Sequence, residues 1–221
     1  YTKTPKISQK SKVKTSVFNR LSSVNSEITT NASISLSFKN WASFTSVSFS
    51  EFGDLKMGKN RSHGFDNWGK VFYFSENKNR NYNASPTLNP DVHLQKNTGY
   101  SQTDVLQKLY IPISENTELK LNIQFSKSSN IPRFDRLAEL KSPSDPSSLK
   151  FAEWYYGPQE RFLFSPQLIL NPGEKWMEKG TLTFAYQNIK ESRIQRKFGS
   201  VNRSYREESV NIFSVNGDFS V

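Results

Sequence analysis

The stretch Asn97–Arg136, NTGYSQTDVLQKLYIPISENTELKLNIQFSKSSNIPRFDR, decides the fold expected of this chain. From Leu119 to Ser126 apolar and polar residues alternate strictly. Successive side chains of a β-strand point to opposite faces, so the alternation predicts a strand with one apolar and one polar face. A second run precedes it, and Ser114–Thr117 joins the two as a polar turn. Both arms exceed the ~5–6 residues of an ordinary strand. The apolar positions are Val105, Leu109, Ile111, Ile113, Leu119, Leu121, Ile123 and Phe125.

The same two-residue period recurs on both sides of this hairpin. Alternating runs occupy residues 12–21, 32–38, 162–170, 182–186 and 213–219. Residues 41–52 are less regular, because Phe44 and Phe49 fall on opposite parities, which a β-bulge would reconcile. Together the runs predict eight antiparallel up-and-down strands.

The connections between these runs alternate in kind. Short turns are expected at Lys39-Asn40, Ser114–Thr117 and Asn171–Glu174, with Trp41 and Trp176 close by. The longer or more polar connections are residues 22–27, 53–96, 128–156 and 198–203. In residues 128–156, which with residues 53–96 form the two long connections, the prolines exclude a central strand and residues 134–141 suit one or two helical turns at most. Short turns at one rim, long loops at the other and aromatic residues at the interface are typical of an outer-membrane β-barrel.

Composition narrows the classes of protein. The chain has 221 residues, a net charge of +10 and no cysteine, which excludes disulfide scaffolds, thiolate metal sites and cysteine nucleophiles. A mean hydropathy of −0.69 fits barrel strands, because half of their residues face a polar lumen. No run reaches the ~18–20 apolar residues of a membrane-spanning helix. The chain begins at Tyr1 without methionine, and we expect it to be a piece of a longer protein.

Several ordered runs resemble TonB-dependent outer-membrane receptors of the Bacteroidetes type. They are FGDLKMGKNRSHGFDNWG, NTGYSQTDVLQKL, SSNIPRFDRL, KFAEWYYGPQ and TFAYQNIKESRIQRKFGS. The resemblance implies a transmembrane antiparallel β-barrel of about 22 strands around a plug. Residues 1–8 would end the plug, and residues 9–221 would form about eight strands of the N-terminal part of the barrel, seen as an open curved sheet.

The resemblance also implies a function. The protein would be a cell outer membrane receptor that takes up a scarce nutrient, such as siderophore-bound iron, by energy-coupled transport. Its partners would be the TonB complex, contacted through an N-terminal segment missing here, the extracellular ligand, lipopolysaccharide and outer-membrane lipid. It would use no cofactor and bind no nucleic acid.

The candidate ligand-binding residues lie in the two long connections, and each has a plainer structural interpretation. His63 lacks a metal partner at close spacing, since His93 is thirty positions away, so no metal site is expected. Asp135 suits a salt bridge to Arg133 or Arg136 that orders the loop, and Trp154 suits the folding of the loop base. The candidates are His63, Trp68, Arg133, Asp135, Arg136, Trp154 and Tyr155.

Other functions remain to be weighed against transport. A basic cluster, Arg193, Arg196, Lys197, Arg203 and Arg206, could meet lipopolysaccharide phosphates or be a solvated charge run. The chain has no nucleophile elbow, phosphate loop or paired-carboxylate motif, so we do not expect an enzyme. A secreted β-sandwich or adhesin-like binding module is the alternative, because it produces the same alternation. A nucleic-acid binder fits less well, because the basic residues are dispersed.

Overall fold

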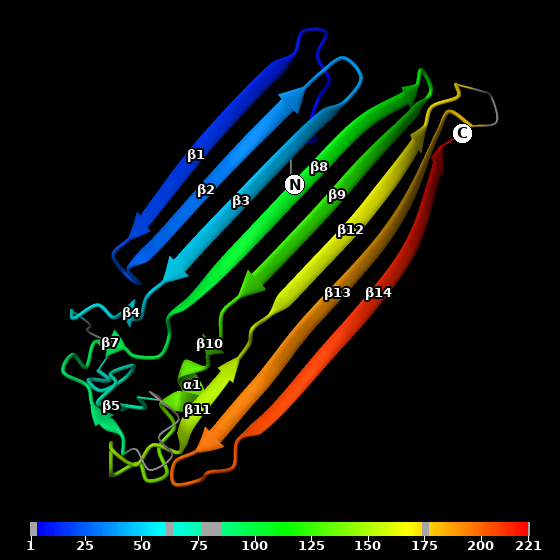
Figure 1. Ribbon diagram of the computed structural model, residues 1–221. Coiled ribbons are helices and arrows are strands. Elements are labelled where there is room, and N and C mark those ends of the chain that lie inside the picture. The colour runs from blue at the N-terminus through cyan, green and yellow to red at the C-terminus, as the bar shows by residue number, and fades with distance from the viewer. Residues whose placement is uncertain (1–3, 61–63, 77–84, 174–176, 221) are drawn as a thin grey trace.

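The computed structural model describes residues 4–60, 64–76, 85–173 and 177–220, and eight long strands run through them. These strands form one antiparallel sheet in which each pairs with the next along the chain (Figure 1). The eight strands expected from the alternation are therefore confirmed. They are β1 (Lys12–Ser22), β2 (Glu27–Ser37), β3 (Ala42–Phe52), β8 (Tyr100–Ser114), β9 (Thr117–Ser128), β12 (Glu160–Leu170), β13 (Lys179–Lys197) and β14 (Ser204–Ser220).

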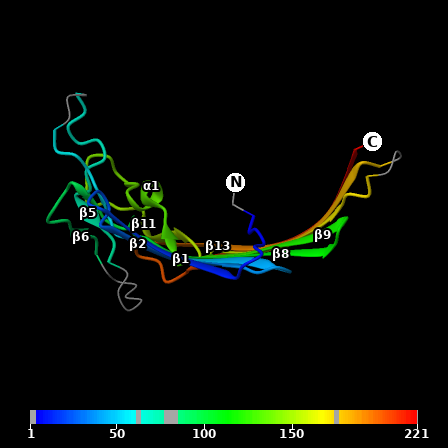
Figure 2. The same cartoon turned by 90° about the horizontal axis from the view of Figure 1, so that it is seen from above.

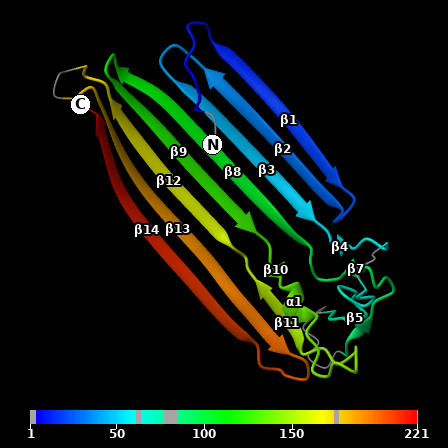
Figure 3. The same cartoon turned by 180° about the vertical axis from the view of Figure 1, so that it is seen from behind.

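The sheet does not close on itself. Its outer strands are β1 and β14, and each pairs with a neighbour on one side only (Figures 1 and 3). The structure thus has the up-and-down order expected of a barrel wall, without the closure. A long strand with one unpaired side exposes a row of backbone N–H and C=O groups, which makes it a template for a further strand.

The connections form two unlike rims. At the short-turn rim, tight connections join β2 to β3 and β8 to β9, and residues 171–178 join β12 to β13. At the long-loop rim lie the connections 53–99 and 129–159, together with the hairpin turns 23–26 and 198–203 (Figure 1). At the short-turn rim the ring of Trp41 stacks on that of Phe38, with 4.6 Å between centroids. Trp176 lies outside the described residues.

The cross-strand register brings most of the apolar residues of the eight strands onto one face. In the middle of the sheet, Ile123 lies opposite Gln107 on β8 and Phe164 on β12. Phe164 in turn lies opposite Tyr186. Directly paired residues share a face, so the parity of each strand follows from that of its neighbour. The apolar face carries Val13, Val17, Ile34, Leu36, Val47, Phe49, Val105, Leu109, Leu119, Leu121, Ile123, Phe125, Phe162, Phe164, Leu168, Leu182, Phe184, Phe213, Val215 and Phe219.

The apolar face is the convex one. The sheet is curved, and the segment leading to β1 lies inside the curve (Figure 2). This segment lies against the face opposite to the apolar one, because Thr4 and Pro5 share a hollow with Lys120, Asn122 and Gln167. The polar face is therefore concave. The expectation that Leu119, Leu121, Ile123 and Phe125 lie on the convex side is confirmed.

No second layer covers the convex face within the described ranges. Large apolar side chains remain open there: Phe184 is 38% exposed, Phe49 50% and Val215 79%. The two small sheets, β4 (Leu55–Lys56) with β7 (Leu94–Gln95) and β5 (Tyr73–Phe74) with β6 (Thr87–Leu88), belong to the first long connection at the rim. An apolar surface of this extent, interrupted by the hydrogen-bonded group of Ser43, Thr45 and Gln107, is unusual for a protein in water.

The β-bulge that would reconcile Phe44 with Phe49 is absent, since β3 pairs with β2 and β8 without a register shift. Phe44 therefore points to the concave face, away from Phe49. One expectation is wrong: the prolines of residues 128–156 were expected to exclude a central strand, yet β11 (Phe151–Tyr156) lies between β13 and β10 (Ile131–Pro132). Short α1 (Phe134–Leu137) falls within the predicted helical stretch.

The reason for β11 is the length of β13, which runs beyond the end of β12. β12 pairs with β13 as far as Lys190, and β11 pairs with the overhang from Arg193 to Lys197. Gly157 and Pro158, joined by a cis peptide bond, separate the two strands. The positions of prolines within residues 128–156 cannot predict this open edge, because the edge belongs to β13, another part of the chain.

Candidate functional site

The base of the second long connection is the most ordered part of the long-loop rim. Strand β11 lies between β13 and β10, and α1 packs against it. The side chains of Leu137, Phe151 and Trp154 form a small buried cluster, with Tyr156 packed against it. The rings of Trp154 and Tyr156 meet edge to face, 5.2 Å between centroids. These aromatic residues anchor the loop by burying apolar area.

Arg133, at the start of α1, is held on three sides. Its Nε donates a hydrogen bond to Asp135 Oδ1 at 2.9 Å, and a terminal nitrogen donates to the Tyr156 hydroxyl at 3.2 Å. Its guanidinium carbon lies 4.8 Å from the centre of the Trp154 ring. The hydrogen bond to Asp135 raises the pKa of Arg133 above its ordinary value. The expected rim salt bridge is thus present, and it orders the loop.

Glu139, a second acidic residue of the same connection, links two of its segments. Glu139 accepts hydrogen bonds from Lys150 Nζ at 2.5 Å and from Arg136 at 3.0 Å. The hydrogen bond from Lys150, with a further one from Arg136, lowers the pKa of the Glu139 carboxyl. The backbone N–H of Lys150 also bonds to the carbonyl of Glu139. Arg136 therefore has a structural partner, as Arg133 has.

A buried ion pair lies on the other face of β11. Glu153 is buried, and its Oε2 lies 3.2 Å from Arg196 Nε and 3.3 Å from Arg203 Nε. The side chain of Arg196 is 1% exposed. Arg203 also donates a hydrogen bond to the Tyr155 hydroxyl, and its guanidinium stacks over that ring. One carboxylate thus joins the turn between β13 and β14 to β11.

The structure gathers most of the candidate residues. Arg133, Asp135 and Trp154 are in contact, and Arg136 lies beside Asp135 on α1. Tyr155 is on β11, and its side chain contacts Arg203 instead. Trp68 belongs to the first long connection and is 69% exposed. His63 lies outside the described residues. The two long connections meet where Ser75 Oγ donates to the carbonyl of Ala152 at 2.6 Å.

Sequence reasoning left Tyr156 and Glu153 out of the candidate ligand-binding residues and assigned Arg193 to a separate basic cluster. Tyr156 follows Trp154 by two positions, a spacing that puts both rings on one face of a strand. That signal was available only if residues 151–156 were taken as a strand. Arg193 lies opposite Tyr156 across β13, and its guanidinium is 5.6 Å from the centre of the ring.

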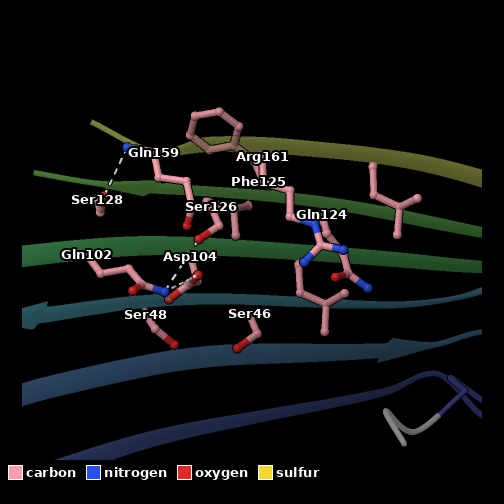
Figure 4. Close-up of a pocket in the computed structure, with 13 residues that line it drawn as sticks. Ser46, Ser48, Gln102, Asp104, Gln124, Phe125, Ser126, Ser128, Gln159 and Arg161 are labelled. Atoms are coloured by element: carbon pink, nitrogen blue, oxygen red, sulfur yellow. Dashed lines mark hydrogen bonds between the residues drawn. The ribbon is translucent and has the colours of Figure 1, made fainter. Parts of the chain in front are cut away.

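The concave face carries a second candidate site, a polar hollow of about 520 Å³ (Figure 4). It lies over β3, β8, β9 and β12 and is lined mainly by hydroxyls and amides, with one acid, one arginine and the apolar residues Val105, Leu106, Phe125 and Leu163. Gln102 donates to both oxygens of Asp104 at 3.0 and 3.1 Å. Asp104 and Arg161 are two strands apart, which is about 10 Å. The labelled lining residues are Ser46, Ser48, Gln102, Asp104, Gln124, Phe125, Ser126, Ser128, Gln159 and Arg161.

Neither candidate site has the arrangement of a metal centre. In the described ranges, no group of three or more histidine and acidic side chains is close enough to share a metal ion. Within the same ranges, no helix has the length and apolar character needed to span a bilayer.

Comparisons with protein-family models, with characterised proteins and with solved structures each returned no match to this chain. The sheet, its two faces and its rims are therefore the features from which a function is inferred.

Proposed function

We propose that this chain is part of the wall of an outer-membrane transporter, a TonB-dependent receptor that takes up a scarce nutrient. The observation that carries the proposal is the register of the sheet, which gathers the apolar residues of eight long strands on an uncovered convex face. An apolar surface of this kind needs an apolar solvent, and lipid chains supply one.

The height of the apolar face matches a bilayer. On β9 its apolar residues are Leu119 to Phe125, and the uncharged stretch of this face runs from Thr117 up to Lys127, where a charged row begins. Lys127 Nζ lies 2.5 Å from Glu160, and Glu160 lies opposite Lys190 on β13. Ten residue steps of ~3.4 Å at the ~40° tilt of barrel strands span roughly 26 Å. The outward apolar band of outer-membrane barrels is ~25 Å tall.

The rest of the molecule supports transport rather than simple anchoring. The concave face is polar and hollowed, and the long connections lie together at one rim, where an outer-membrane barrel has its extracellular loops. The free edges of β1 and β14 are suited to pairing with further strands of the same wall. The ligand would be a small scarce nutrient such as an iron siderophore, and the TonB complex would supply the energy.

The secreted β-sandwich alternative makes a different prediction for the convex side chains. In a sandwich these side chains face a second sheet and are sealed from both lipid and water. In a barrel wall they face lipid, while residues of the other parity face water.

Spin labels at single cysteines distinguish the two architectures, and the absence of native cysteine makes each label unique. We would label Ile123→Cys, Phe184→Cys and Gln124→Cys in the intact protein, reconstituted in lipid vesicles. Collision with dissolved oxygen should be high at positions 123 and 184, whereas a water-soluble nickel chelate should reach only position 124. Low accessibility to both reagents at 123 and 184 would refute the membrane wall.

Transport is tested by uptake in cells. Cells lacking the intact protein should lose accumulation of one radiolabelled nutrient from a panel of siderophores, haem and cobalamin. A protonophore should abolish the same uptake in wild-type cells, because the TonB complex draws on the proton gradient. Uptake that persists in the deletion strain for every nutrient tested would contradict the transport part of the proposal.

A further inference from the structure

The basic residues near the turn between β13 and β14 divide into two groups. Arg196 and Arg203 share the carboxylate of Glu153, as described above. Arg193 and Arg206 lie opposite each other across the hairpin. Their parity is that of residues 183 and 187 on β13, which belong to the concave face. They therefore face away from surrounding lipid.

Two adjoining hollows lie beside this basic pair, the smaller on the concave side and the larger at the hairpin turn. The smaller, about 130 Å³, is lined by Arg193 and Arg206 together with Trp154. The larger, about 270 Å³, lies at the hairpin turn and has a different basic lining: Arg196, Lys197 and Arg203. Gln195 and Ser204 line both hollows and so connect them. None of the described residues that line either hollow is acidic.

The pair is electrostatically unbalanced. Like charges directly opposite each other across two strands are unfavourable. In the described part of the chain, no carboxylate lies within ion-pair distance of Arg193 or Arg206. The nearest acidic pair on this face, Glu191 and Glu208, is one row nearer the middle of the sheet. Two residue steps along a strand are about 7 Å between Cα atoms, and in the described residues neither acid forms an ion pair with either arginine.

The ring of Tyr156 holds Arg193 in place. The guanidinium of Arg193 lies 5.6 Å from the centre of the Tyr156 ring, and Tyr156 is itself bonded to Arg133. A guanidinium stacked on a ring keeps its N–H groups in the plane free to donate. Arg193 is therefore oriented before any ligand arrives, which lowers the entropy cost of binding.

We propose that the rim end of the β13–β14 hairpin binds a multivalent oxyanion group, a phosphate or a polycarboxylate, carried by a soluble ligand. Arg193 and Arg206 bind its oxygens, and Ser204 and Gln195 donate further hydrogen bonds. The smaller hollow has the volume of about four water molecules, which suits one such group rather than a whole nutrient. The larger hollow receives the adjoining part of the ligand. That this anion belongs to the cargo rests on the proposed function.

The test measures anion binding to the intact protein in detergent by calorimetry, with pyrophosphate and citrate as probes. Arg193→Gln and Arg206→Gln should each weaken binding of at least one probe about tenfold or more, because each removes a charge-assisted hydrogen bond. Arg193→Lys should recover part of the loss, since it keeps the charge but not the planar pair of donors. Lys190→Gln is the matched control: it removes one charge from the same strand on the convex face and should leave binding unchanged.

The results separate this site from the transport proposal. Wild-type protein that binds neither probe, or Gln variants that bind both as wild type does, would overturn the anion site. Binding only to vesicles containing lipopolysaccharide, and not to the soluble anions, would overturn it in favour of a lipid contact. If the site binds and the spin labels at positions 123 and 184 are sealed, the anion site stands and the membrane wall fails. Loss of strand signal in circular dichroism identifies misfolded variants, and Arg193→Lys then carries the test.

Discussion

The most specific prediction for the convex face concerns the stability effect of substitutions at Ile123. This residue lies in the middle of β9, between Gln107 and Phe164 on the neighbouring strands. Lys127, where the apolar band ends, is four residue steps away, and these steps correspond to about 10 Å of depth at a tilt of ~40°. Ile123→Arg thus puts a charge near the middle of a ~25 Å band. Such a charge on the lipid face of a barrel costs about 2–4 kcal/mol, or about 100-fold in the folding equilibrium.

A second substitution at the same position separates lipid from a protein core. Ile123→Trp adds volume, which a close-packed core accommodates only at about 1–3 kcal/mol or more. Lipid chains rearrange around the larger side chain, so we expect a change below about 0.5 kcal/mol. Gln124→Arg, one residue away on the concave face, should also be nearly neutral, because its side chain lies in the polar hollow.

The assay is denaturant unfolding of the intact protein in lipid vesicles, followed by tryptophan fluorescence. Ile123→Arg should shift the midpoint strongly, while Ile123→Trp and Gln124→Arg should stay close to wild type. If Ile123→Trp costs as much as Ile123→Arg, the convex side chains pack against protein. If Ile123→Arg costs nothing, they face water. Either result refutes the reasoning.

Three further predictions concern the loop base. Trp154→Ala should cost about 3–5 kcal/mol, because Trp154 is 9% exposed within the aromatic cluster, and limited proteolysis should then cut the second long connection faster. Glu153→Ala should cost about 3–5 kcal/mol by leaving Arg196 buried without its carboxylate, and Glu153→Ala combined with Arg196→Met should recover much of the loss in denaturant unfolding. The lowered pKa of Glu139 means that its contacts stabilise the loop above the ordinary glutamate pKa of ~4.3 and are lost as pH falls through the lowered value. Amide exchange at Lys150 should therefore gain protection as pH rises through this window, beyond the intrinsic pH dependence of exchange, and Glu139→Gln should remove that gain.

The strands and their faces could be read from local pattern, because alternation is a property of the extended backbone itself. Leu119 and Phe125 share a parity whatever surrounds them, and Ser114–Thr117 forms a turn for equally local reasons. The site was partly accessible in the same way. Arg133 and Asp135 are two residues apart, and their salt bridge needs no distant partner.

What only the tertiary structure decided involves residues that are far apart along the chain. The pairing of Thr45 with Gln107 crosses the whole first long connection, so no local pattern sets that register. The overhang of β13 created an edge for β11, and a proline rule applied to residues 128–156 missed it. Opposite parity of Arg193 and Arg196 was visible in the sequence. The sequence did not show that Arg196 faces a buried carboxylate and Arg193 an open hollow. That depended on how β11 and the hairpin turn pack around the two arginines, because a charge is balanced by its neighbours in space and not by those in sequence.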